Sequence, residues 1–154
     1  MKGKGEDQQK MQYLKIVDQN IEEFGFLITT VLEDKKTTPF GYSTGLYQNY
    51  GIPELFISGL PSGLTQELID QYSSKYKQGL VPENVLISDL SDRFSIYFTK
   101  VKLEKLDDYV LSSVRFYEKK DYKYLQLVYP DLKGFFPGEE KYDYDQEIFG
   151  EIIH

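Results

Sequence analysis

The chain of 154 residues contains no cysteine and no tryptophan, and its single histidine, His154, is the last residue. Without cysteine the protein cannot form a disulfide, use a thiol nucleophile or bind a metal through thiolates. One imidazole at the end of the chain provides neither a metal site nor the base of a catalytic triad. The lack of cysteine also fits a reducing compartment.

Long apolar runs are missing as well. No stretch of about 18 apolar residues could span a membrane, and residues 1–7 lack the apolar segment of a signal peptide. We therefore predict a cytoplasmic protein with no membrane partner and a flexible start over residues 1–7. Because no phosphate-binding loop, dinucleotide fingerprint, zinc-binding spacing, EF-hand or serine-hydrolase motif is present, we predict no cofactor and no metal.

The net charge of −7 is concentrated in one segment. Residues 139–154 contain one lysine, Lys141, and six acidic residues. The acidic residues are Glu139, Glu140, Asp143, Asp145, Glu147 and Glu151. The arginines, Arg93 and Arg115, lie far apart in the sequence. Because phosphate binding draws on clustered Lys and Arg, this pattern disfavours nucleic acid and anionic lipid as partners.

The aromatic content is high: 14 Tyr and 10 Phe make up 16% of the chain. Much of the core must therefore consist of rings, and buried tyrosine hydroxyls will need hydrogen-bond partners. The length suits one domain, residues 1–154, with one core.

Hydrophobic periodicity predicts three helices and six strands. The helices are expected at 11–24, where Gly25 ends the pattern, from Ser62 to Gly79, and at 103–117. The strands are expected at 26–32, 40–44, 54–58, 85–87, 94–101 and 124–129. The order αβββαββαβ lacks regular βαβ alternation. It therefore predicts an α+β fold in which about three helices pack on a mostly antiparallel mixed sheet.

Three segments carry a resemblance to a known family. They are FGYSTGL at 40–46, PELFISGLP at 53–61, and LQLVYPD at 125–131 running into GFFP at 134–137. In order and spacing, they are similar to an uncharacterised bacterial family, the domain of unknown function 4262. The similarity extends from about residue 16 to residue 138.

The resemblance implies a shared fold and shared surfaces. It implies no catalytic residues, because no activity is established for the family. Members usually carry a histidine where this chain has Ile52, and often a tryptophan where it has Gly138. The resemblance therefore transfers no imidazole chemistry to this chain.

Five polar side chains at predicted strand ends form a candidate pocket: Tyr42, Ser43, Glu54, Tyr129 and Asp131. Strand-end loops often carry function, and two carboxylates with hydroxyls beside them could face one cleft. The alternative is structural: Tyr42 packs, Glu54 accepts hydrogen bonds from the backbone, and Asp131 caps a turn.

A second candidate is the acidic aromatic segment. Its predicted partner-binding residues are Glu139, Glu140, Tyr142, Asp143, Tyr144 and Asp145. Carboxylates interleaved with tyrosines suit a basic protein surface, because acidic and basic surfaces steer together and tyrosine is favoured at contacts. The alternative is a solvated and partly mobile tail.

Three functional hypotheses follow. The first is a non-enzymatic protein-binding module, such as an immunity or antidote protein that occupies a basic toxin. The alternative is an enzyme or small-molecule binder that uses the candidate pocket. The third is a homodimer in which Tyr and Phe cover the subunit interface.

Overall fold

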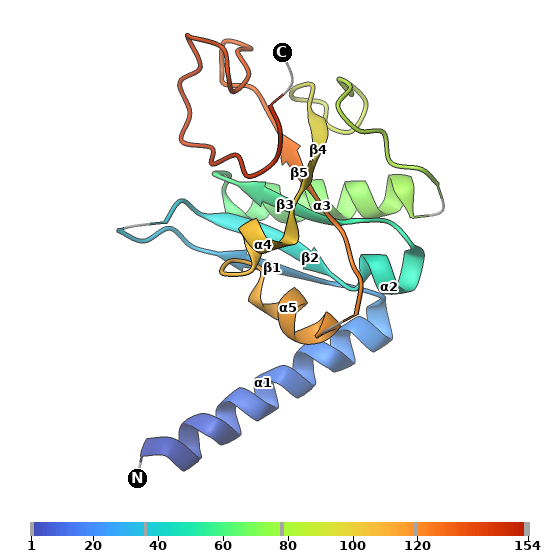
Figure 1. The fold of residues 1–154 in the computed structure, drawn as a ribbon, viewed down its shortest axis with the longest axis vertical. Coiled ribbons are helices and arrows are strands. Elements are labelled where there is room, and N and C mark those ends of the chain that lie inside the picture. Colours follow the sequence, from blue (N-terminus) through green and yellow to red (C-terminus); the bar gives the residue numbers. More distant parts are fainter. Residues whose placement is uncertain (1, 36, 78, 119, 153–154) are drawn as a thin grey trace.

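The computed structural model describes residues 2–35, 37–77, 79–118 and 120–152. Its centre is one five-stranded sheet with the strand order β1-β2-β3-β5-β4 (Figure 1). The strands are β1 Leu27–Val31, β2 Phe40–Thr44, β3 Glu54–Ser58, β4 Tyr97–Val101 and β5 Tyr124–Val128. Neighbouring strands are antiparallel except β3 and β5, which run parallel and pair Glu54 with Tyr124. The sheet is therefore mixed, as expected.

The helices of the described chain cover both faces of the sheet. They are α1 Lys2–Phe24, α2 Leu46–Tyr50, α3 Ser62–Tyr76, α4 Leu103–Leu106 and α5 Leu111–Tyr117. α3 packs on one face, and α4 and α5 lie on the other (Figure 1). The predicted α+β class is confirmed.

The expected number of helices and the expected order of elements were wrong. The described chain has five helices in the order αββαβαβααβ. α2 is too short to show a helical period, and the predicted helix at 103–117 is divided by a turn after Leu106. The predicted strand at 85–87 makes a single bridge, from Ile87 to Ile96.

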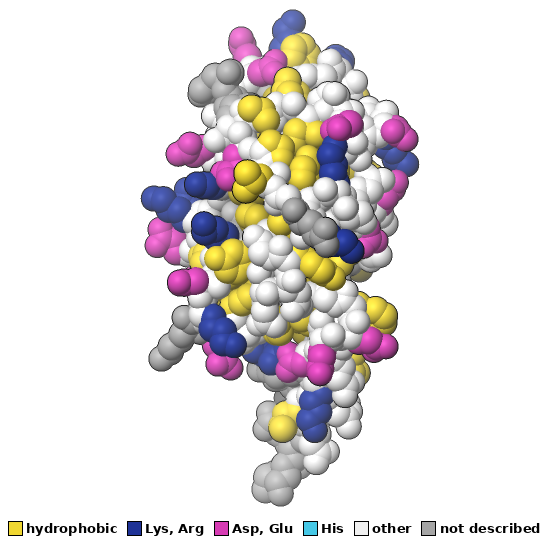
Figure 2. All heavy atoms as spheres, turned by 90° about the vertical axis from the view of Figure 1, so that its right-hand side faces the viewer, with side chains coloured by type: hydrophobic (Ala, Val, Ile, Leu, Met, Phe, Trp, Pro, Cys, Tyr) yellow, Lys and Arg dark blue, Asp and Glu magenta, His cyan; other side chains and the backbone are white. Residues whose placement is uncertain are grey.

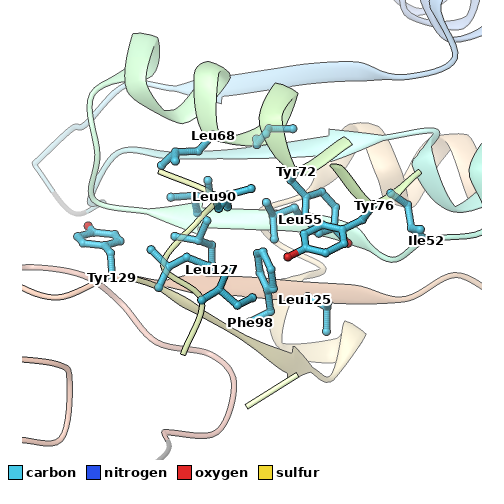
Figure 3. Close-up of a cluster of buried hydrophobic side chains, with 14 of the residues drawn as sticks. Ile52, Leu55, Leu68, Tyr72, Tyr76, Leu90, Phe98, Leu125, Leu127 and Tyr129 are labelled. Atoms are coloured by element: carbon cyan, nitrogen blue, oxygen red, sulfur yellow. The ribbon is translucent and has the colours of Figure 1, made fainter. Parts of the chain in front are cut away.

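The larger hydrophobic core lies between α3 and the sheet (Figure 3). Alternate residues of the strands point toward α3, as Leu55 and Ile57 do on β3, because successive strand residues face opposite sides. The rings of Tyr72 and Phe98 meet at 5.2 Å between centroids. Ile52 lies at one end of this core and Tyr129 at the other.

The second core, on the opposite face, is mainly aromatic. Phe56 contacts Phe40 at 5.6 Å and Phe149 at 5.6 Å between ring centroids. Phe149 comes from the C-terminal segment, so this segment closes the face on which α5 packs.

α1 packs on the rest of the molecule near its C-terminal end, where Val17 and Ile21 are buried. It extends away from the sheet in Figure 1. Met11 and Ile16 are exposed on it. No helix in the described part of the chain combines the length and hydrophobicity needed to span a membrane.

Candidate functional site

Glu54, the first residue of β3, is fully buried and accepts five hydrogen bonds. Its donors are the Ser43 hydroxyl at 2.7 Å, the backbone N–H groups of Gly45 at 2.8 Å, Leu46 at 3.1 Å and Tyr47 at 3.1 Å, and the Tyr117 hydroxyl. The carboxyl group is thus enclosed by donors from the end of β2, the start of α2, and α5.

The backbone donors come from the start of α2, whose first N–H groups have no partner within the helix. Only glycine suits position 45, where the chain passes from β2 into α2. Its φ is +112°, and a Cβ atom there would lie 2.8 Å from the Gly25 carbonyl oxygen. Glu54 therefore caps a helix from a neighbouring strand, where a negative charge is also favoured by the helix dipole.

The directions of these hydrogen bonds show which form of the Glu54 carboxyl group the surrounding donors satisfy. The Ser43 hydroxyl accepts from the Leu55 N–H at 2.9 Å, and the Tyr117 hydroxyl accepts from the Gln48 N–H at 3.2 Å. Both hydroxyls therefore donate to Glu54, which faces donors only, and an ionised carboxylate satisfies such a set.

Two opposing effects act on the pKa of Glu54. Burial raises the pKa above its ordinary value, and the hydrogen bonds from Tyr117 and Ser43 oppose that shift. The pKa of Tyr117 is itself raised, first by burial and then by the nearby charge of Glu54.

A second layer of polar groups surrounds this site. The Ser43 carbonyl accepts from the hydroxyls of Tyr124 at 2.6 Å and Ser113 at 3.1 Å, and Ser113 also bonds Thr44 at 2.6 Å. These bonds join β2 to α5 and β5. Because the donors around Glu54 are already used inside the protein, this cluster is built to hold the fold together.

The structure brings two of the predicted pocket residues, Ser43 and Glu54, into contact. Tyr42 packs against Phe40, and its hydroxyl accepts from the Ser112 N–H at 3.1 Å. Tyr129 and Asp131 follow the far end of β5, whereas Glu54 pairs with the first residue of that parallel strand. They therefore lie at the other end of the sheet from Glu54, and the five side chains line no common pocket.

Buried polar side chains hold the C-terminal segment against the sheet. Gln146 accepts from the Tyr129 N–H at 3.2 Å and donates to its carbonyl at 2.9 Å. Gln126, on β5, donates to the Glu147 carbonyl at 2.6 Å and accepts from the Phe149 N–H at 2.8 Å. Gln126 stands in an otherwise apolar strand, where a buried amide must be paired, whereas nothing in the sequence pointed to Gln146.

Asp131 fixes the turn beside the acidic aromatic segment. One carboxylate oxygen accepts from the N–H groups of Lys133 at 2.9 Å and Phe135 at 3.0 Å, and the other accepts from the Asp143 N–H at 3.1 Å. Asp131 thus has the structural role of a turn cap and also holds residue 143 in place.

The outward side of this segment is acidic. We name residues 139–145 the acidic loop; its carboxylates are exposed and belong to Glu139, Glu140, Asp143 and Asp145. Tyr144 is 39% exposed, and the neighbouring Leu132 is 92% exposed. A hollow of about 470 Å³ lies between Asp131 and the loop. Burial raises the pKa of Tyr142 to about 12, so its hydroxyl is neutral.

In the part of the chain that the structure describes, no group of three or more His, Cys, Asp or Glu side chains is arranged to hold a metal ion. His154 lies outside the described residues.

One protein family matches residues 20–143, most of the chain, and its description is "Domain of unknown function (DUF4262)". Neither the curated proteins nor the solved structures include a match. The matched region contains the Glu54 cluster, Asp131 and residues 139–143 of the acidic loop. The resemblance seen in the three sequence segments is confirmed, and the chain belongs to the family of the domain of unknown function 4262.

Proposed function

We propose that this protein is a non-enzymatic binding module whose acidic loop docks on a basic surface of another protein. One observation carries the proposal: Asp131 and Gln146 hold the loop by its inner side, and its four carboxylates face solvent. One partner of this kind would be a basic toxin, which this protein would bind and neutralise as an immunity or antidote protein does.

Anchoring favours binding because an ordered loop loses little conformational freedom when it meets a partner. Its carboxylates would steer a basic protein toward it, and opposite charges align the two surfaces. Tyr144 and Leu132 add exposed apolar area beside the charges, which suits the centre of a protein interface.

The Glu54 cluster supports the non-enzymatic reading. A general acid or base needs access to a substrate, and Glu54 is fully buried with donors from its own chain around it. The predicted companion carboxylate, Asp131, uses both oxygens to bind backbone N–H groups.

The test compares two variants that each remove four negative charges. E139Q/E140Q/D143N/D145N neutralises the acidic loop, and E22Q/E23Q/E67Q/D70N neutralises exposed carboxylates of α1 and α3. Both should unfold within about 0.5 kcal/mol of the wild type, since exposed positions contribute little to stability. The tagged proteins are used to capture partners from the native host.

A captured basic protein is then purified, and its affinity is measured by calorimetry at low and high salt. We expect the loop variant to bind about tenfold or more weakly, the control to match the wild type, and affinity to fall with salt. Equal weakening in both variants, or no basic partner that depends on the loop, would contradict the proposal.

A further inference from the structure

A cavity of about 520 Å³ opens at the end of the sheet where β3 and β5 begin and β4 ends. Residues before β3, after α3 and before β5 line it, and none of them belongs to the predicted pocket or the acidic loop. α2 and the loop after α3 lie on the right of Figure 1, the side that Figure 2 turns to the viewer. Hydrophobic side chains gather along the middle of that side.

The cavity walls are mostly apolar and aromatic. Its apolar lining includes Ile52, Val81, Leu103, Tyr122 and Leu125. A volume of 300–1,000 Å³ with walls of this kind is typical of sites for small organic molecules. Leu80, also in the lining, is 95% exposed. A bound molecule could cover its side chain.

Two lysines give the cavity a positive side. Lys100 pairs with Leu125 across the β4–β5 ladder, and Lys123 lies two residues before Leu125. Lys123 immediately precedes β5, and both lysines line the cavity.

Among the described residues that line the cavity, Glu83 is the one carboxylate. Glu83 lies 3.9 Å from Lys100, and Lys123 has no ion pair with any described residue. Like charges that line one cavity repel, and an anion between them would relieve that repulsion.

We propose that this cavity binds a small organic anion, with its aromatic or aliphatic part against Val81 and Tyr122 and its carboxylate between Lys100 and Lys123. The volume of the cavity suits a small molecule, its apolar walls suit the aromatic or aliphatic part, and its two lysines suit the carboxylate. The site is separate from the acidic loop, so it stands or falls independently of the proposed protein partner.

The test titrates the ¹⁵N-labelled protein with 4-phenylbutyrate and, as the matched neutral probe, with 4-phenylbutanamide. Amide chemical shifts report where each probe binds. We expect saturable shifts at Gly79, Leu80, Val81, Glu83 and Leu103, unchanged shifts in the acidic loop, and a Kd for the carboxylate below about 1 mM. The neutral probe, 4-phenylbutanamide, should bind about tenfold more weakly than 4-phenylbutyrate, because it forms no charge-assisted hydrogen bond with the lysines.

A lysine pair supplies the matched variants. Lys123→Ala removes one of the proposed anion ligands, whereas Lys102→Ala removes an exposed neighbouring charge that does not line the cavity. We expect about tenfold weaker 4-phenylbutyrate binding for Lys123→Ala and less than about twofold change for Lys102→Ala.

Three results would overturn the proposal. They are equal binding of the two probes, equal loss in the two variants, and shifts that do not saturate or that fall outside the cavity. An unfolding curve for each variant confirms that the compared proteins are folded.

Discussion

Glu54 and the acidic loop place carboxylates at opposite ends of one sheet, beside α2 and in the C-terminal segment that Figure 1 draws in orange and red. They differ in where their hydrogen-bond donors come from. Glu54 takes five donors from its own chain and is fully buried. The loop carboxylates are exposed, and among the described residues only the Phe136 N–H, which donates to Glu139 at 3.1 Å, serves them, so water or a partner supplies their other donors. A buried acid that is satisfied internally holds the fold, and an exposed acid on an anchored loop is available for binding.

Asp131 shows that location alone does not decide the role. It lies beside the acidic loop, yet it is buried and accepts three backbone N–H groups. Like Glu54, Asp131 is therefore satisfied by donors from its own chain. Substitutions that remove such donors, or that release the acidic loop, test the comparison between buried and exposed carboxylates directly.

The largest effect is expected from Glu54→Gln. The amide replaces one acceptor oxygen with an NH₂ group, which would face N–H and O–H donors. We expect the free energy of unfolding, measured in urea, to fall by about 3–5 kcal/mol.

Glu140→Gln is the matched control, because it makes the same chemical change on an exposed carboxylate. Its effect should stay within about 0.5 kcal/mol. A loss below about 1 kcal/mol for Glu54→Gln would show that the donor cluster does not depend on the carboxylate.

A smaller loss is expected from Tyr117→Phe. The variant removes a donor to Glu54 and leaves the Gln48 N–H without its acceptor, at a cost of about 1–3 kcal/mol. Tyr122 stacks on Tyr117 at 4.5 Å between centroids and forms no hydrogen bond with any described residue. Tyr122→Phe should therefore change stability by less than about 0.5 kcal/mol. Equal losses of stability in the two variants would mean that the effect of Tyr117→Phe comes from ring packing and not from its hydrogen bonds.

The stability of the wild type should also depend on pH through Glu54. Because the pKa of Glu54 is raised in the folded protein, the folded state keeps this proton at pH values where the unfolded chain has lost it. Glu54 therefore lowers the free energy of unfolding as pH rises from about 4.5 to its folded pKa, by at most about 1.4 kcal/mol per pH unit.

The hydrogen bond from Tyr117 lowers that pKa, so Tyr117→Phe should extend the decline to higher pH. Urea midpoints measured from pH 5 to pH 8 should show a gap between Tyr117→Phe and Tyr122→Phe that widens with pH. A constant gap would mean that Glu54 does not titrate in this range.

The sequence was sufficient for elements whose signal is local. The strand at 40–44 and the strand at 54–58 were predicted with the bounds that β2 and β3 have. α2 was missed because the N–H groups of its first turn are satisfied by Glu54, a residue outside the helix. The start of α1 was missed because the apolar spacing begins only at Met11, nine residues after Lys2.

The site was predictable only in part, for a physical reason. Ser43 and Glu54 lie on neighbouring antiparallel strands, and the predicted proximity of their strand ends was sufficient to group them. To locate Asp131 relative to these two residues, one must know the direction of β5 relative to β3. A single sequence does not reveal that these two strands pair in parallel. The cavity beside Lys100 and Lys123 depends on the same pairing.

The smallest effect on global stability, and the sharpest test of the loop, is expected from Gln126→Leu. Leucine fills a similar volume in the buried strand but cannot hold the backbone of Glu147 and Phe149. Lifting the segment exposes those backbone groups to water, so the global loss should stay near about 1 kcal/mol. Hydrogen exchange across residues 139–150 should nevertheless become faster. If the amides of the acidic loop remain as protected as in the wild type, Gln126 does not hold the loop. The order that distinguishes its carboxylates from a solvated tail would then depend on Asp131 and Gln146 alone.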